Sequence, residues 1–244
     1  MSALEFRSVS VRYGDAVVVD SIDLVVPHGK IVGLVGESGS GKSSLAQAAV
    51  GMVPLAGGSI FLDGVETRKR KRFGSLQMVF QDPFGSLDPR MRIGRSISEA
   101  IPKEPGTGAA ARRGEVERLL ELVGIDPELS GVLPSQMSGG QLQRVGIARA
   151  LASKPDVIIA DEITSALDAS IQGAVLNLLR ELQRSLGLSM LFISHNMAVV
   201  RYVSDIVAVM HEGAIVEQGP ADRLLDHATH PYTRELLAAA RLEL

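Results

Sequence analysis

A glycine-rich run near the N-terminus has the residue types that hold phosphate groups. It matches the pattern G-x-x-x-x-G-K-[ST] and reads Gly36, Glu37, Ser38, Gly39, Ser40, Gly41, Lys42 and Ser43, with Ser44 next. Its glycines let backbone N–H groups close around phosphate oxygens, and a following helix adds the positive end of its dipole. The pattern predicts that Lys42 reaches the β- and γ-phosphates of a nucleotide and that Ser43 contacts Mg²⁺. The alternative, an ordinary glycine-rich turn, needs neither the lysine nor the serine.

Two adjacent carboxylates follow an apolar strand later in the chain. The predicted strand over residues 157–160 ends at Asp161 and Glu162, and open α/β sheets bind ligands at the carboxyl ends of their strands. Asp161 is predicted to hold Mg²⁺, directly or through water, and Glu162 to polarise an attacking water. The alternative is a pair of acids that caps the next helix, and the upstream phosphate-binding run disfavours it.

A second glycine-rich element precedes a helical pattern that ends at residue 151. It reads Ser138, Gly139, Gly140 and Gln141. A hydroxyl and glycine N–H groups at the start of a helix could form a second anion site. A simple capped turn explains the same residues, because one phosphate-binding run does not by itself require two anion sites.

Hydrophobic periodicity places these groups at the ends of strands and helices. Strands are predicted over residues 4–11, 16–26, 31–35, 59–62, 76–80, 157–160, 190–193, 206–210 and 214–218. Helices are predicted over residues 42–50, 114–123, 139–151, 171–186, 221–225 and 232–240, and residues 83–101 pass from loop into helix. Strands that alternate with helices predict a parallel sheet covered on both faces, preceded here by a β-rich N-terminal part.

The middle of the chain interrupts this alternation. Residues 82–150 are mostly helical, and we interpret them as a helical subdomain inserted into an α/β core of residues 1–81 and 151–220. Residues 221–244 then form a C-terminal helical tail. The chain of 244 residues is therefore predicted to be a single domain, 1–244, of α/β class.

Composition excludes several function classes. Apolar residues make up 45% of the chain, which is enough for a sizeable core, and the net charge of -3 gives no drive toward nucleic acid. The absence of cysteine excludes disulfides and thiolate metal sites. No secretory signal and no apolar run long enough to span a membrane are visible, so a link to a membrane is expected to go through a partner.

Several motifs together resemble the ATP-binding domain of ABC transporters. In chain order they are GESGSGKS, MSGGQLQRVGIARAL, DVIIADE, SALD and SHN. The resemblance implies a P-loop ABC ATPase fold, with a RecA-like parallel sheet in a mixed β core, an antiparallel N-terminal β part and an inserted helical subdomain. It implies that the chain binds ATP and Mg²⁺ and hydrolyses ATP.

The resemblance also implies roles for residues near the bound nucleotide. Tyr13 matches the aromatic residue that stacks on adenine. Gln81 matches the glutamine that touches Mg²⁺ and the attacking water, and it begins the loop that senses the membrane subunit. His195 matches the switch histidine that contacts the γ-phosphate and positions Glu162.

Other matched residues imply a partner domain. Ser138, Gly139, Gly140 and Gln141 match the signature that grips the γ-phosphate of the ATP on an opposing domain, and Asp168 matches the end of the loop at that dimer interface. The implied partners are a second ATP-binding domain, identical or paralogous, and membrane permease subunits, with an extracytoplasmic cargo-binding protein acting indirectly. The implied location is peripheral, on the cytoplasmic face of the cell membrane.

Two strings narrow the resemblance to the peptide/nickel import subfamily. They are FQDPFGSLDPRM at residues 80–91 and HPYTRELL at residues 230–237. They imply an importer for peptides or nickel-type metal complexes. A soluble ABC ATPase acting on DNA or ribosomes is the alternative, although the coiled coils, zinc cysteines or second ATPase domain usual in such relatives are missing. A generic P-loop kinase leaves the Ser138–Gln141 element unexplained.

The sequence departs from the family pattern at a few positions. Met137 replaces the usual leucine before the signature, and both are unbranched apolar residues. Ile163 replaces the usual proline after Glu162, which restores an N–H and is expected to relax the turn, whereas ATPase activity is still expected because Glu162 remains. The basic run at residues 68–72 is interpreted as a solvated surface loop, with contact to anionic lipid or a partner as the alternative.

Overall fold

The computed structural model describes residues 2–69, 73–103 and 108–242. Within these ranges the strands form two sheets, one of four strands in the order β2-β1-β4-β5 and one of six in the order β10-β9-β3-β8-β7-β6. In the larger sheet β9, β3, β8, β7 and β6 run parallel, and β10 pairs antiparallel with β9 at one edge. The predicted α/β class, with an antiparallel N-terminal part and a mainly parallel sheet, is confirmed.

The strands agree with the predicted ones to within a few residues at their ends. They are β1 (Ser2–Tyr13), β2 (Ala16–Pro27), β3 (Ile31–Val35), β4 (Gly57–Leu62), β5 (Val65–Glu66), β6 (Leu76–Val79), β7 (Val157–Asp161), β8 (Ser189–Ser194), β9 (Ile206–His211) and β10 (Ala214–Pro220). The short strand β5 was not predicted, because two residues carry no periodic pattern.

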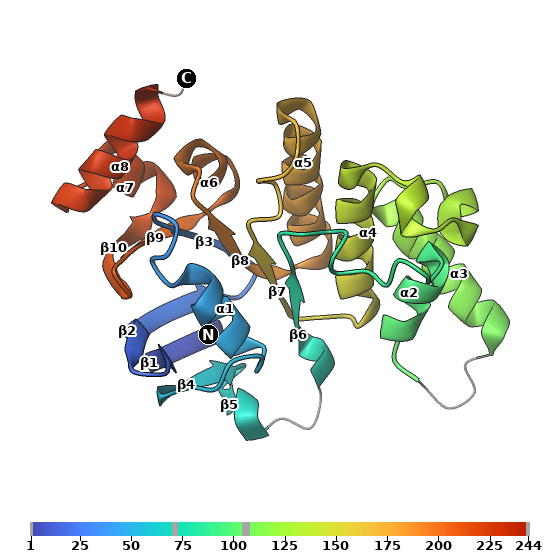
Figure 1. The fold of residues 1–244 in the computed structure, drawn as a ribbon, viewed down its shortest axis with the longest axis horizontal. Coiled ribbons are helices and arrows are strands. Elements are labelled where there is room, and N and C mark those ends of the chain that lie inside the picture. Colours follow the sequence, from blue (N-terminus) through green and yellow to red (C-terminus); the bar gives the residue numbers. More distant parts are fainter. Residues whose placement is uncertain (1, 70–72, 104–107, 243–244) are drawn as a thin grey trace.

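The helices lie mainly beside the larger sheet (Figure 1). They are α1 (Lys42–Ala49), α2 (Ile93–Ala100), α3 (Ala109–Leu122), α4 (Gly139–Ala152), α5 (Ala169–Leu186), α6 (Met197–Val203), α7 (Ala221–Asp226) and α8 (Pro231–Leu242). Short 3₁₀ turns lie at Thr67–Lys69, Phe73–Ser75, Pro127–Gly131 and Pro134–Gln136. Helix α3 begins five residues before the predicted start, since the alanines and arginines that precede residue 114 are strong helix formers.

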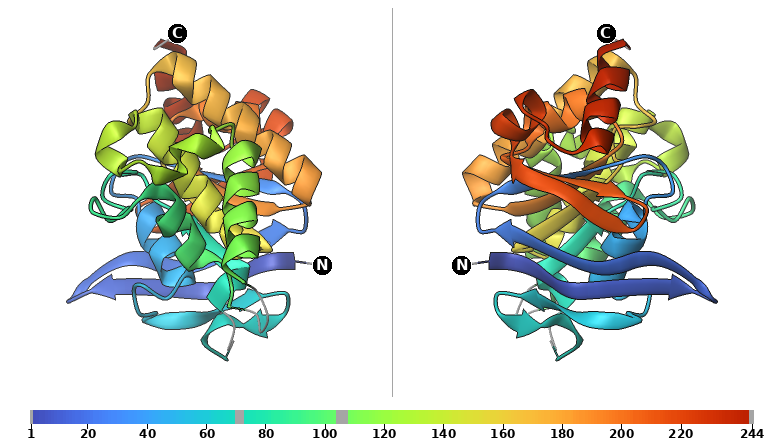
Figure 2. Two further views of the ribbon diagram at one scale, coloured as in Figure 1. Left: turned by 90° about the vertical axis from the view of Figure 1, so that its right-hand side faces the viewer. Right: turned by 90° about the vertical axis from the view of Figure 1, so that its left-hand side faces the viewer.

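Two apolar clusters hold the layers together. Alternate residues of the central strands face opposite sides, so that Val32 and Leu34 pack toward α1 and the antiparallel sheet, whereas Ile31 and Val35 pack toward the other helices. The cluster that contains Ile31 and Val35 continues without a break from the sheet into α2, α3 and α4. The antiparallel sheet and α8 lie at opposite ends of the molecule (Figure 2).

The helical middle segment and the C-terminal segment are joined closely to the sheet. Helices α2, α3 and α4 share one buried apolar cluster with β7 and β8, so packing does not mark where a helical subdomain would begin or end. The predicted boundaries at residues 82 and 150 therefore stay a prediction. Tyr232 of α8 is buried in the same cluster, as are Leu224 and Leu225 of α7, so both helices pack against the core. Of the basic run at 68–72, Arg68 donates to the carbonyl of Leu55, and residues 70–72 lie outside the described part of the chain.

Candidate functional site

The glycine-rich loop connects β3 to α1, as the sequence predicts. A Cβ atom on Gly36 would lie 2.0 Å from the carbonyl oxygen of Met210, and one on Gly41 would lie 2.5 Å from that of Val18. Only glycine therefore fits between the loop and strands β9 and β2. Helix α1 begins at Lys42 with no side-chain cap and no acidic residue in its first turn, which leaves its first N–H groups available to an anion.

Lys42 is held beneath the loop by backbone oxygens. Its Nζ donates to the carbonyls of Gly36 at 2.8 Å and Glu37 at 2.7 Å, and lies 3.3 Å from Ser40 Oγ. Burial lowers the pKa of the Lys42 ammonium, and the carboxylates of Glu162, Asp161 and Glu37 oppose that shift. These contacts fix a cation where the loop would receive phosphate oxygens.

Ser43 and Asp161 form a pair of oxygen ligands at the end of β7. Ser43 Oγ donates to Asp161 Oδ1 at 3.1 Å. Burial raises the pKa of Asp161, although the hydrogen bond from Ser43 acts in the opposite direction. A hydroxyl and a carboxylate beside a phosphate-binding loop suit Mg²⁺, which prefers a few oxygen ligands of the protein and completes its shell with phosphate and water. No group of three His, Cys, Asp or Glu residues that could hold a metal occurs in the described ranges.

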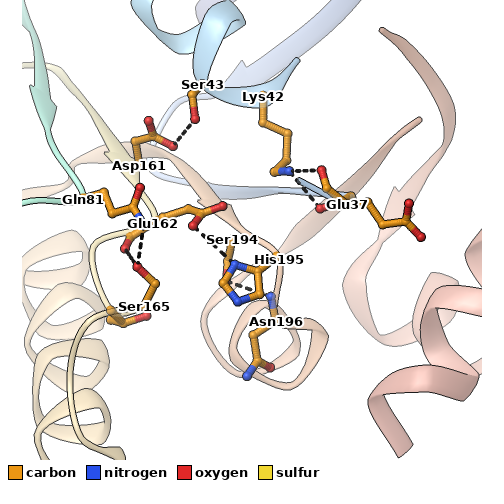
Figure 3. A network of polar contacts seen from close by, with 12 residues as sticks. Glu37, Lys42, Ser43, Gln81, Asp161, Glu162, Ser165, Ser194, His195 and Asn196 are labelled. Carbon is orange, nitrogen blue, oxygen red and sulfur yellow. Dashed lines mark hydrogen bonds and ion pairs between the residues drawn. The ribbon is translucent and has the colours of Figure 1, made fainter. Parts of the chain in front are cut away.

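Glu162 lies beside Asp161 but points toward a different partner (Figure 3). Its Oε2 is 3.3 Å from His195 Nδ1, and its backbone has the left-handed φ of 48°, which is uncommon for a residue with a side chain. The side chain of Ile163 is only 1% exposed. The buried side chain anchors the residue that follows Glu162, and the expectation that Ile163 relaxes this turn stays a prediction.

Gln81 reaches the same region through a serine. Its Nε2 donates to Ser165 Oγ at 3.2 Å, and Ser165 Oγ donates to the backbone carbonyl of Glu162 at 2.9 Å (Figure 3). The sequence motif that contains Ser165 gave it no role of its own. Asn196 was also missed: its Oδ1 accepts from the first N–H groups of α6 and fixes the helix that follows His195.

A cavity of about 620 Å³ brings together two of the catalytic candidates, Glu162 and His195, whereas Gln81 does not line it. It is lined by the loop residues Gly36, Glu37 and Ser38, by Glu162 and His195, and by α8. Tyr13 lies outside this cavity, 48% exposed, with its hydroxyl 3.4 Å from Ser44 Oγ. A position at the rim beside α1 is compatible with the predicted contact to adenine, which stays a prediction.

The Ser138–Gln141 element lines a different cavity, of about 310 Å³. Ser138 and Gln141 form a reciprocal capping box at the start of α4, with Ser138 N donating to Gln141 Oε1 at 2.9 Å and Gln141 N to Ser138 Oγ at 3.3 Å. Gly140 is needed for close packing, since a Cβ atom there would lie 2.4 Å from a methyl carbon of Ile171. The two cavities have no lining residue in common. Asp168 lies at the start of α5 and makes no side-chain capping bond there.

The model of the ABC transporter family matches residues 19–165. The chain belongs to the ABC transporter family. It is 44% identical over 226 residues to a putative peptide import ATP-binding protein of Brucella abortus (strain 2308), covering 90% of this chain and 68% of that protein. It is also 44% identical over 227 residues to the oligopeptide transport ATP-binding protein OppF of Lactococcus lactis subsp. lactis (strain IL1403), covering 91% of this chain and 71% of OppF.

Solved structures of ABC cassettes share the whole fold. CbiO1 of Clostridium perfringens, part of the transporter complex CbiONQ, superposes with a TM-score of 0.82 at 27% identity, covering 100% of this chain and 96% of CbiO1. The cassette MJ0796, a dimer in a post-hydrolysis state with ADP and phosphate, gives a TM-score of 0.78 at 25% identity, covering 89% and 98%. These findings confirm the predicted ABC ATPase fold and the ATPase class, and they do not favour action on DNA or ribosomes. Helices of the described residues are all too short or too polar to cross a membrane.

Proposed function

We propose that this ABC family ATPase energises a peptide importer from the cytoplasmic face of the membrane, with permease subunits as its direct partners. The peptide importer names of two relatives at 44% identity support the cargo class. The resemblance of residues 80–91 and 230–237 to the peptide/nickel subfamily agrees with it. A cargo-binding protein on the other side of the membrane would act through the permease, and nucleic acid is not a partner.

The observation that carries the mechanism is the separation of the two anion sites. The phosphate-binding loop, Glu162 and His195 share one cavity, whereas Ser138 and Gln141 line another. The cavity that Ser138 and Gln141 line includes no residue of the phosphate-binding loop, and we infer that Ser138–Gln141 serves the ATP bound to a second ATP-binding domain. The dimer of MJ0796 is a precedent for such pairing within the family.

Within one site, we propose a task for each side chain. Lys42 and the first N–H groups of α1 bind the phosphates, and Tyr13 stacks on adenine. Ser43 and Asp161, with Gln81, would hold Mg²⁺, which neutralises phosphate charge when it is bound. Glu162 accepts a proton from the attacking water, and His195 holds that carboxylate in place.

The cargo is tested by uptake in the cells that produce the protein. Deletion of the chain should abolish uptake of short labelled peptides while leaving Ni²⁺ uptake intact, and the wild-type gene should restore it. A complementing gene with Glu162→Gln should not. Loss of Ni²⁺ uptake with normal peptide uptake would assign the chain to nickel-type complexes instead.

A further inference from the structure

The C-terminal helix α8 makes a direct hydrogen bond to the phosphate-binding loop. The backbone N–H of Glu37 donates to the hydroxyl of Tyr232 at 3.0 Å, joining residues that are 195 positions apart. The Tyr232 side chain is 7% exposed, and its ring stacks on His211 with the centroids 3.8 Å apart. None of the nucleotide-binding roles described above uses this tyrosine.

The bond falls on the peptide group that also holds the lysine. The amide between Gly36 and Glu37 presents its carbonyl to Lys42 Nζ at 2.8 Å and its N–H to Tyr232 at 3.0 Å. Both ends of one peptide plane are therefore fixed, one by the catalytic cation and the other by α8. Rotation of this plane would carry the Gly36 carbonyl away from Lys42, so the tyrosine fixes one of the two backbone carbonyls that hold the ammonium.

The start of α8 is itself anchored, which makes Tyr232 a fixed point. The Glu217 carboxylate of β10 accepts from the N–H and the hydroxyl of Thr229, both at 2.8 Å, and from the N–H of His230 at 3.1 Å. Burial alone would raise the pKa of Glu217, but hydrogen bonding from Thr229, Thr233 and His230 outweighs it and lowers the pKa to about 2. The carboxylate is thus charged at neutral pH, where it accepts all three bonds.

The turn between β9 and β10 and the helix α8 make further contacts around the phosphate-binding loop and its cavity. The N–H of Gly213, in the turn between β9 and β10, donates to the carbonyl of Ser40 at 3.1 Å. Leu236 and Ala239 of α8 line the 620 Å³ cavity together with Glu162 and His195. Helix α8 therefore forms a wall of the nucleotide site, and the turn before β10 contacts the loop.

From these contacts we infer that Tyr232 is a positioning residue for nucleotide binding, acting through the Gly36–Glu37 peptide on Lys42. The inference rests on the proposed ATP-binding role of the loop. Burial raises the pKa of the Tyr232 phenol, so it stays protonated and uncharged over the working pH range. Movement of α8 would then change ATP affinity without any change in the loop sequence.

The test replaces only the hydroxyl. Tyr232→Phe keeps the ring on His211 and removes the acceptor of Glu37 N–H, so ATP should bind about two- to tenfold more weakly, as for the loss of one hydrogen bond. Hydrogen exchange at the Glu37 amide should accelerate, and the midpoint of urea unfolding should fall slightly, because a part-buried N–H loses its acceptor. Tyr202→Phe is the matched control, since Tyr202 is 47% exposed on α6 and its hydroxyl pairs with Asn177.

A second variant, Glu217→Ala, tests the Tyr232 contact by removing the anchor at the start of α8. Glu217→Ala frees the start of α8 without touching the loop, so it should weaken ATP binding in the wild-type background and add little in Tyr232→Phe. Wild-type ATP affinity and wild-type Glu37 exchange in Tyr232→Phe would overturn the inference, and so would additive effects of the two changes. If Tyr232→Phe does not fold, wild-type affinity in Glu217→Ala overturns it. Failure of the wild-type chain to bind ATP would instead refute the proposed function.

Discussion

Glu162→Gln separates proton acceptance from every other property of this side chain. The two side chains have the same shape, and the glutamine oxygen can keep the contact with His195 Nδ1, now 3.3 Å from Glu162 Oε2. What disappears is the ability to take a proton from water. Loss of a general base lowers rates by on the order of 10²–10⁴, or about 2.7–5.5 kcal/mol of transition-state stabilisation. ATP binding should be unchanged, because Lys42 and α1 are untouched.

The assay for this variant is phosphate release, with the oligomeric state in ATP measured by light scattering. We expect hydrolysis to stop and a dimer to accumulate in ATP. Glu212→Gln is the matched control: Glu212 has a similar left-handed φ of 45° but is exposed in the turn between β9 and β10. Hydrolysis at the wild-type rate in Glu162→Gln would refute the assignment of the base. A similar loss of hydrolysis in Glu212→Gln would show that replacing a glutamate of left-handed φ is enough to lower the rate, without any change in proton transfer.

Three further changes test other parts of the site. Ser138→Arg should leave ATP affinity of the monomer intact and prevent the ATP-dependent dimer, and weaker binding by the monomer would contradict a role in the opposing site. Asp161→Asn should raise the melting temperature of the nucleotide-free protein at pH 7, because burial raises the pKa of Asp161 and its charge therefore costs stability. This gain should vanish as the pH falls toward 4, where the Asp161 carboxyl of the wild type becomes protonated. The same variant should lose ATP hydrolysis. Gly36→Ala should lower the free energy of unfolding by on the order of 1–3 kcal/mol in urea, since its Cβ atom would lie 2.0 Å from the Met210 carbonyl oxygen; an unchanged midpoint would refute that close approach.

The sequence predicts the site well where chemistry is confined to a short motif at the end of a strand. Ser43 and Asp161 come from motifs far apart in the chain, yet both follow parallel strands, whose carboxyl ends meet at one edge of the sheet. The same rule brings His195, after β8, to Glu162, after β7. Helix α6 was missed because its seven residues are mostly β-branched or aromatic and too short for a periodic pattern.

Contacts between distant elements could not be predicted in this way. The residue type of Tyr232 gives no sign that its hydroxyl meets a backbone N–H of the phosphate-binding loop, because the contact depends on how α8 packs against β9 and α6. Ser165 likewise joins Gln81 to Glu162 only after two loops come together. A backbone partner leaves no complementary side chain in the sequence to signal the pairing.

The turn that carries Glu162 is held by hydrogen bonds and by a buried side chain on either side of the carboxylate. Proline would restrict the chain after Glu162 by fixing one dihedral angle. Here Glu162 N–H donates to the Ile193 carbonyl at 3.0 Å, and the Glu162 carbonyl accepts from Ser165 N at 3.1 Å and Ser165 Oγ at 2.9 Å. The buried Ile163 side chain fixes the next residue in the apolar cluster. A left-handed φ costs on the order of 1–3 kcal/mol and persists only where its surroundings determine it, and these contacts do so on both sides of the carboxylate. The geometry of the base therefore depends on the core around β7 and β8, in which the Ile163 side chain is buried.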